Sequence, residues 1–201
     1  MFKKVLFIIM TLCLMFAPVS VSASNFDENG LIIEPTYQAY VSVFDEGYTY
    51  NSVHLKWFSN SYWDYYKVYR ATSKNGKYYL VDTVYDNEYI VDGLATGKTY
   101  YFKVRGYNEY GYFESLSIQS TPKLDNIATI YKNGNTLHWS KVDGASAYAV
   151  YRQKSNGAYT RVSRTKLNAH TGKKGYTYKV RAYRKVKTNY VYSNYTRGIK
   201  L

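Results

Sequence analysis

Cysteine, proline and long hydrophobic runs are scarce in this sequence. Its 201 residues include 3 prolines and a single cysteine, Cys13. One cysteine cannot form an internal disulfide, so core packing must stabilise the folded chain. Cys13 lies in an apolar segment behind the bulky Leu12, a position that favours an apolar filler over a lipid attachment site. After residue 24 no apolar segment is long enough to span a bilayer as a helix.

Motifs for catalysis and metal binding are also absent. The sequence has no Gly-x-Ser-x-Gly elbow, and His54, His138 and His170 lack the spacing of metal ligands. Residues 123–201 have two acidic side chains, Asp125 and Asp143, both expected near turns, which disfavours the paired acids of a glycosidase. We therefore expect a protein that is not an enzyme and that needs no cofactor or metal.

The first 23 residues have the composition of a secretory signal peptide. Lys3 and Lys4 provide a positive start, residues 5–16 are almost entirely apolar, and small residues precede a cleavage site after Ala23. An uncleaved anchor is the weaker alternative, because the apolar run of about a dozen residues is shorter than the roughly 20 that cross a bilayer. We expect a secreted protein, extracellular or associated with the cell wall, with an acidic linker over 24–33.

The remaining chain repeats one unit in tandem. Leu-Lys-Trp at 55–57 returns as Leu-His-Trp at 137–139, which is 82 residues later. Tyr-Lys-Val-Tyr-Arg at 66–70 returns as Tyr-Ala-Val-Tyr-Arg at 148–152, with the same offset. Two motifs with one offset indicate an internal duplication.

A third motif follows in the same order. It is Tyr-Tyr-Phe-Lys-Val-Arg at 100–105 and Tyr-Thr-Tyr-Lys-Val-Arg at 176–181, now 76 residues apart, so the second copy has lost part of a loop. A period near 80 residues is the size of a small domain and too long for a solenoid repeat. We predict one domain over 34–121 and a second over 122–201, joined at Thr121-Pro122.

Apolar and polar residues alternate in both copies. Val53, Leu55 and Trp57 fall on one face of an extended segment, and Phe102 and Val104 continue the pattern. No stretch after the leader keeps helical spacing for three turns. Asn-Gly pairs, which are typical of tight hairpins, separate the runs at 75–76, 133–134 and 156–157. The pattern predicts an all-β chain of two tandem antiparallel β-sandwiches.

Taken together, these motifs resemble a fibronectin type III domain. The resemblance rests on Leu-x-Trp, on Tyr-x-Val-Tyr-Arg, and on the run from Gly93 to Arg105 that Asn108 and Gly111 follow. The second copy is similar but looser, with Leu167 as its only counterpart of the Leu-x-x-Gly corner. The resemblance implies immunoglobulin-like sandwiches for nearly all of the chain after the leader. The Arg-Gly-Asp tripeptide of some members is absent, so integrin binding is not implied.

The resemblance also implies structural roles for aromatic residues. It makes Trp57 and Trp139 the core tryptophans of strand B, and Tyr100 and Tyr176 the corner tyrosines near the start of strand F. The expected core aromatics are Trp57, Tyr66, Tyr100, Trp139, Tyr148 and Tyr176.

Charge is divided unevenly between the two domains. Residues 24–122 contain 8 basic and 12 acidic residues, a net −4, whereas residues 123–201 contain 17 basic and 2 acidic residues, a net +15. This charge exceeds what solubility requires, and its self-repulsion destabilises the fold. The imbalance favours a polyanion ligand for the second domain over a merely solvated basic surface.

Strand alternation locates a candidate binding surface. Tyr178 and Val180 are expected to point into the core, so Lys179 and Arg181 point outward, near Tyr151 of the neighbouring strand. Cations interleaved with aromatic rings can neutralise phosphates or carboxylates, although ordinary cross-strand pairs are the alternative. The candidate polyanion-binding residues are Tyr151, Arg152, Lys179, Arg181, Tyr183, Arg184, Lys185 and Lys187, the last three at a loop tip.

Two functions from different classes remain open at this point. The first is a secreted, non-catalytic binding or adhesion module whose basic domain attaches to an anionic cell-wall polymer, to lipid headgroups or to extracellular DNA. Specific nucleic-acid recognition is not expected, because no known binding motif is present. The alternative is a structural or protein–protein interaction protein with no polyanion ligand.

Overall fold

The computed structural model describes residues 40–201, which form β-strands connected by turns and loops. The expected signal peptide (1–23), the linker (24–33) and the start of the first predicted domain lie outside these residues. In the described part of the chain, no helix is long and apolar enough to cross a membrane. The prediction of an all-β chain is confirmed.

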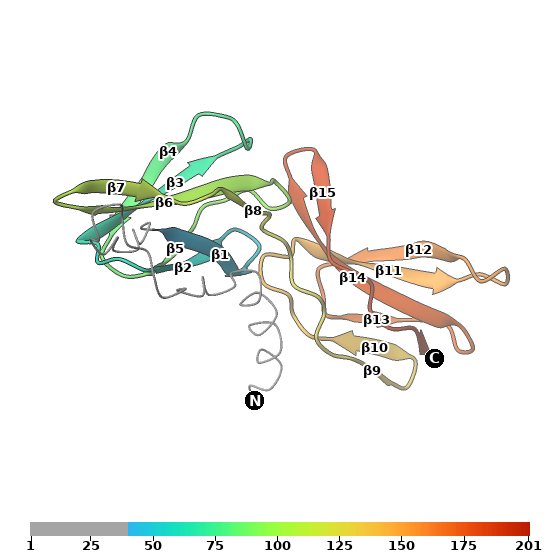
Figure 1. Ribbon diagram of the computed structural model, residues 1–201. Coiled ribbons are helices and arrows are strands. Elements are labelled where there is room, and N and C mark those ends of the chain that lie inside the picture. Colours follow the sequence, from blue (N-terminus) through green and yellow to red (C-terminus); the bar gives the residue numbers. More distant parts are fainter. Residues whose placement is uncertain (1–39) are drawn as a thin grey trace, which may run out of the picture. The chain divides into compact units, whose positions relative to one another are not determined.

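The first sandwich consists of two antiparallel sheets (Figure 1). One has the strand order β1–β2–β5, and the other has the order β4–β3–β6–β7, with β8 also paired to β6. The strands are β1 Val41–Tyr48, β2 Val53–Ser59, β3 Tyr65–Ala71, β4 Tyr79–Val84, β5 Glu88–Val91, β6 Tyr100–Asn108, β7 Gly111–Glu114 and β8 Ile118–Ser120.

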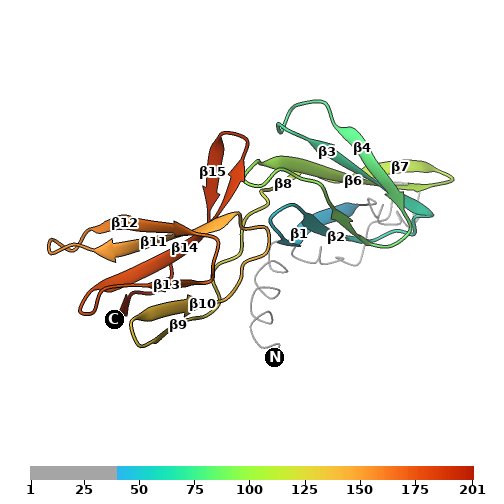
Figure 2. The same ribbon diagram turned by 180° about the vertical axis from the view of Figure 1, so that it is seen from behind.

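The second sandwich repeats this topology, as the view from behind also shows (Figure 2). One sheet has the order β9–β10–β13, and the other has the order β12–β11–β14–β15, with β16 also paired to β14. The strands are β9 Ile130–Asn133, β10 Thr136–Trp139, β11 Ala147–Gln153, β12 Tyr159–Thr165, β13 Ala169–Thr171, β14 Thr177–Val186, β15 Asn189–Tyr192 and β16 Ile199–Lys200.

Two of the Asn-Gly pairs form the hairpins expected of them. Gly134 turns the chain between β9 and β10 with a φ of 56°, and Gly157 lies between β11 and β12 with a φ of 83°. These positive values are accessible to glycine at no steric cost, whereas a Cβ would strain both turns.

Each sandwich has its own core, built around the same aromatic pair. Trp57 is fully buried and packs edge-to-face on Tyr66, with ring centroids 5.3 Å apart. Trp139, 4% exposed, packs in the same way on Tyr148 at 5.5 Å. Edge-to-face contacts add about 1 kcal/mol to the large apolar area that such rings bury. The tandem repeat in the sequence is therefore a repeat of the core as well.

The corner tyrosine of the second sandwich is Tyr178 and not Tyr176. In the first sandwich the buried Tyr100 accepts a hydrogen bond from the Ala95 N–H at 3.0 Å. In the second, Tyr178 accepts the corresponding bond from the Lys173 N–H at 2.8 Å and is 2% exposed. The expectation for Tyr176 is wrong, since its side chain is 43% exposed.

A glycine explains this shift. Gly97 has a φ of 77° and lies three residues before Tyr100, and Gly175 has a φ of 87° and lies three residues before Tyr178. The left-handed glycine turns the chain into the strand and so determines which tyrosine reaches back to the corner. An alignment on the Lys-Val-Arg motif at 103–105 and 179–181 pairs Tyr100 with Tyr176, which lies two residues before the corner tyrosine Tyr178.

The reassignment predicts different costs for two similar substitutions. Tyr178→Phe removes the acceptor of the Lys173 N–H and should lower the free energy of unfolding by about 1 kcal/mol. Tyr176→Phe removes an exposed hydroxyl and should change it by less than about 0.5 kcal/mol. Urea unfolding of both variants measures the difference. A loss for Tyr176→Phe as large as that for Tyr178→Phe would contradict the assignment.

Candidate functional site

Tyrosine side chains cover the outer face of the β12–β11–β14–β15 sheet. Tyr151 and Tyr183 are each 8% exposed and form a cluster with Ala147 and Ala149 that is separate from the core. We call this surface the second tyrosine face. Its rings belong to Tyr151, Tyr159, Tyr183, Tyr190, Tyr192 and Tyr195.

Arg181 lies at the centre of the second tyrosine face. Its Nε and Nη2 donate hydrogen bonds to the Tyr151 hydroxyl at 3.2 and 2.8 Å. Its Cζ lies 3.8 Å from the Tyr192 ring centroid and 4.5 Å from that of Tyr195. Burial and the neighbouring Tyr151 raise the pKa of Tyr195, so that phenol stays neutral and does not offset the guanidinium charge. The cation is thus held in place without being neutralised.

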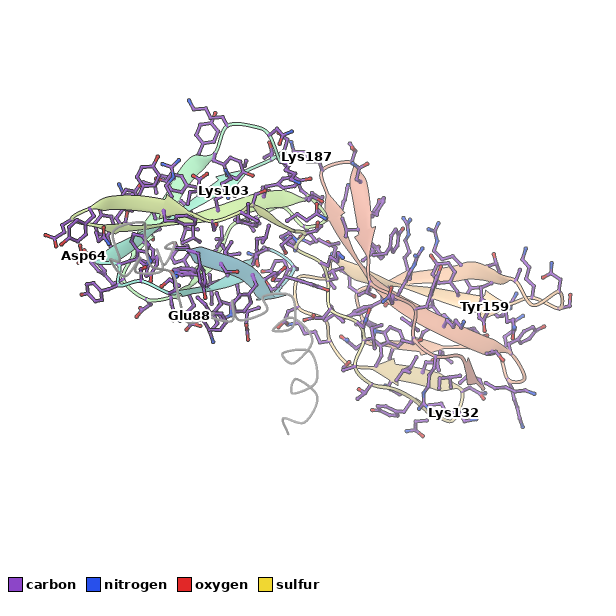
Figure 3. All side chains as sticks on the ribbon, viewed as in Figure 1. Asp64, Glu88, Lys103, Lys132, Tyr159 and Lys187 are labelled. Carbon is purple, nitrogen blue, oxygen red and sulfur yellow. The ribbon has the colours of Figure 1, made fainter. Side chains whose placement is uncertain are left out.

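Further cations flank Arg181 on the same face. The Lys179 ammonium lies 4.6 Å from the ring of Tyr159, which is labelled in Figure 3. The Arg164 guanidinium lies 5.1 Å from the Tyr190 ring. These charges come from β12 and β14, on either side of β11. Arg164, Lys179 and Arg181 therefore form a row of cations across the sheet, and each stacks on a tyrosine ring.

The first sandwich has the same kind of face but a different charge balance. On the β4–β3–β6–β7 sheet, Arg105 stacks on Tyr69 at 4.6 Å, and Lys103 stacks on Tyr78 at 4.9 Å. Glu114 accepts from both cations, at 2.5 Å from Lys103 Nζ and 2.6 Å from Arg105 Nε. One carboxylate thus compensates much of the charge of this face.

No such carboxylate stands on the second tyrosine face. Its sandwich contains two acidic residues, Asp125 and Asp143, and neither lies on the strands of this sheet. Within residues 40–201, every ion pair lies in the first sandwich. The cations of the second tyrosine face have ring partners but no counter-charge in the described chain.

The structure brings part of the predicted site together. Lys179, Arg181 and Tyr183 alternate along β14, and Tyr151 pairs with Lys179 across the strands. Tyr151 and Tyr183 are buried by neighbouring side chains, so they position the cations of this face and offer little surface to a ligand. Lys185 is exposed opposite Tyr190 at the end of the same face.

Arg152 and Arg184 lie elsewhere. Strand alternation turns Arg152 away from the second tyrosine face, and its guanidinium stacks on Tyr176 at 4.7 Å. Arg184 donates to the Gly144 carbonyl at 2.7 Å. Both side chains thus have intramolecular partners away from the predicted surface.

The expected loop tip is shorter than predicted. The strand β14 continues to Val186 and pairs with β15, so Arg184 and Lys185 are strand residues. Lys187 alone of the three is in the turn, with a φ of 55°. The aromatic residues on both strands extend the hairpin beyond the point at which the basic run suggested a loop.

Sequence reasoning missed the tyrosines and arginine that complete the face. Tyr190 and Tyr192 alternate along β15, a signal that could have placed both rings beside Tyr183. Arg164 was harder to place, because a register shift between Val150 and Tyr151 interrupts the alternation of β12.

Comparisons with known proteins bear on the fold alone. No family model and no curated protein matches the sequence. A two-domain fibronectin type III segment of chicken tenascin is 15% identical, covers 80% of this chain and 98% of its own, and has a TM-score of 0.47. The FN1-FN3 domains of chicken contactin are 13% identical, with coverages of 79% and 64% and a TM-score of 0.34. The prediction of two tandem antiparallel β-sandwiches is confirmed by the four sheets of the described residues.

The compensated first face predicts a specific dependence on pH. Burial alone would raise the pKa of Glu114, but hydrogen bonds from Lys103 and Arg105 outweigh burial and lower it. A carboxyl whose pKa is lowered by folding stabilises the protein above its unfolded pKa of about 4.3, and this contribution is lost as the pH falls through the folded pKa. Glu114→Gln should therefore lose less stability between pH 7 and pH 3 than the unchanged protein. Thermal unfolding of both proteins at the two pH values measures this difference in stability loss.

Glu109→Gln provides the control, because Glu109 is exposed and has no ion pair with a described residue. It should leave the pH dependence nearly unchanged. Equal slopes for all three proteins would contradict the role of Glu114.

Proposed function

We propose that this chain is a secreted, non-catalytic binding module that attaches to anionic polymers through the second tyrosine face. The single observation that carries the proposal is the uncompensated charge of that face. Its cations are fixed on tyrosine rings, but no described carboxylate pairs with them. A polymer with phosphate or carboxylate groups would supply the missing counter-charge.

The overall charge supports the same conclusion. Residues 123–201 have a net +15, which attracts any polyanion and releases its counterions on binding. Charge in such excess is unfavourable for an isolated fold, so an external partner for it is the simpler explanation. The attraction is sensitive to salt and does not by itself select one polymer.

The fixed geometry of Arg181 adds to this attraction. Because Tyr151, Tyr192 and Tyr195 hold the guanidinium, little side-chain entropy remains to be lost on binding. Its Nη1 makes no hydrogen bond to a described residue and can donate to a ligand oxygen. The exposed Tyr195 ring offers a flat surface to a sugar or a base beside that donor.

Acidic cell-wall glycans, anionic lipid headgroups and extracellular DNA all present the required groups. Retention of the mature chain on purified cell wall, on anionic liposomes and on DNA should be measured between about 50 and 500 mM salt. Retention of one ligand near physiological salt identifies the target. Absence of retention at every salt concentration overturns the proposal and favours a structural or protein-binding role.

Restoring a carboxylate tests the face itself. Tyr195→Glu places an acid where a ring now stacks on Arg181, by analogy with Glu114 beside Arg105. We expect about a 10-fold loss of polyanion affinity and a salt dependence lower by about one counterion. Titrations at two salt concentrations measure both quantities.

Tyr131→Glu is the matched control. Tyr131 lies on β9 in the opposite sheet of the same sandwich and is 58% exposed, so the substitution and the change in net charge are identical. We expect less than about a 3-fold loss of affinity. Equal losses for Tyr131→Glu and Tyr195→Glu would mean that net charge acts alone and that the second tyrosine face is not the site.

A further inference from the structure

One end of the first sandwich has an acidic and aromatic hollow that the proposed function does not use. It is formed where the β2–β3 loop meets the β6–β7 turn, and Figure 3 labels Asp64 there. We call it the loop-end site. Its lining residues are Ser61, Tyr62, Asp64, Asn108, Glu109 and Tyr110.

Hydrogen bonds hold the two loops in one arrangement. The Asp64 N–H donates to the Tyr107 carbonyl at 2.8 Å, and the Asn108 side-chain amide donates to the Tyr62 carbonyl at 3.2 Å. The Tyr110 N–H donates to the Asn108 side-chain oxygen at 3.0 Å. The lining side chains therefore project from a fixed backbone, which lowers the entropic cost of binding.

A buried contact supports the same loop. Trp63 packs so closely on Gly106 that a Cβ at Gly106 would lie 2.6 Å from Trp63 Cδ2. With the offset of 82 residues that relates the two core tryptophans, residues 62–64 correspond to Gly144, Ala145 and Ser146. The second sandwich thus lacks the tyrosine, the tryptophan and the acid. The loop-end site is a feature of the first sandwich alone.

The two tyrosine rings and the two carboxylates of the loop-end site have no side-chain partner within residues 40–201. Tyr62 is 82% exposed and Tyr110 is 88% exposed, and neither ring stacks on a described cation, unlike the tyrosines of both outer faces. Neither Asp64 nor Glu109 forms an ion pair with a described residue. Aromatic faces beside free carboxylates are the groups that recognise an ammonium ion.

We propose that the loop-end site binds a lysine side chain from the second sandwich of another copy of this chain. The sandwich formed by residues 123–201 has 17 basic residues and a net +15, and none of its cations forms an ion pair in the described chain. The first domain, residues 34–121, has a net −2, and its linker brings this to −4. Charge complementarity therefore favours pairing of the first domain of one copy with the second domain of the next.

Such pairing is heterologous, because the two surfaces in contact differ. Each copy in a singly paired dimer retains one free surface of each kind, so association continues head-to-tail unless the rotation between copies closes a ring. The contact is exposed and ionic, and its affinity must therefore fall steeply with salt. The loop-end site lies in the first sandwich, whereas the proposed polyanion site lies in the second, so this inference does not depend on polyanion binding.

Sedimentation of the mature chain at about 50 mM and about 500 mM salt tests the proposal. We expect a weight-average mass that rises with protein concentration at low salt and stays monomeric at high salt. The double variant Tyr62→Ala with Asp64→Asn should raise the dissociation constant about 10-fold, because it removes a ring and a carboxylate from the site.

The chain offers a closely matched control. Tyr48 is 45% exposed and Glu46 is exposed, and both lie on β1, where Tyr48 pairs with Val53 at the start of β2 and thus at the end of the sandwich opposite to the β2–β3 loop. Tyr48→Ala with Glu46→Gln removes a ring and one carboxylate charge, and it should change the dissociation constant less than about 2-fold. Thermal unfolding of both double variants verifies that each is folded.

Three outcomes would overturn the proposal. They are a monomer at low salt, association that persists at 500 mM salt and is thus not ionic, and equal weakening by the two double variants. The Tyr195→Glu variant separates this proposal from the previous one, because its loss of polyanion retention is measured on immobilised ligand without self-association. Either proposal can therefore fail while the other stands.

Discussion

The stacking of cations on tyrosine rings is the interaction on which both outer faces depend. Small sandwiches without disulfides bury a limited fraction of their surface, so a second packed layer outside the core is valuable to them. Arg105 on Tyr69 and Arg181 on Tyr192 build such layers while their charges stay near water. The high tyrosine content, 27 residues, therefore serves packing beyond the two cores.

One position changes what the same packing can do. Glu114 forms ion pairs with both Lys103 and Arg105, so much of the charge on the first face is compensated within the face itself. On the second face, the partners of Arg181 are neutral phenols, which orient the guanidinium without satisfying its charge. Under the proposed function, a guanidinium fixed in this way would bind an external anion, whereas the guanidinium of Arg105 already has its counter-charge within the fold.

Period-two patterns predicted the faces of the strands but could not predict register. A shift of two residues leaves every side chain on its own face, so Lys179 and Arg181 were placed outward correctly even though the corner was assigned to Tyr176 in place of Tyr178. The register depends on the turn at Gly175, whose positive φ is not visible in the alternation. The contact of the Tyr195 ring with Arg181 depends on the path of the chain between β15 and β16, which the alternation of residues does not predict.

The two halves have diverged in opposite senses from one duplicated unit. In the first half, Glu114 forms ion pairs on the outer sheet face, whereas Asp64 and Glu109 at the loop end form none with a described residue. The second has only two acids, and none of its cations forms an ion pair with a described residue. The large excess of unpaired cations on the second domain destabilises an isolated chain, and an external partner would offset that cost. A polyanion would pair with the second domain alone, whereas another copy of the chain would pair with charged groups of both domains.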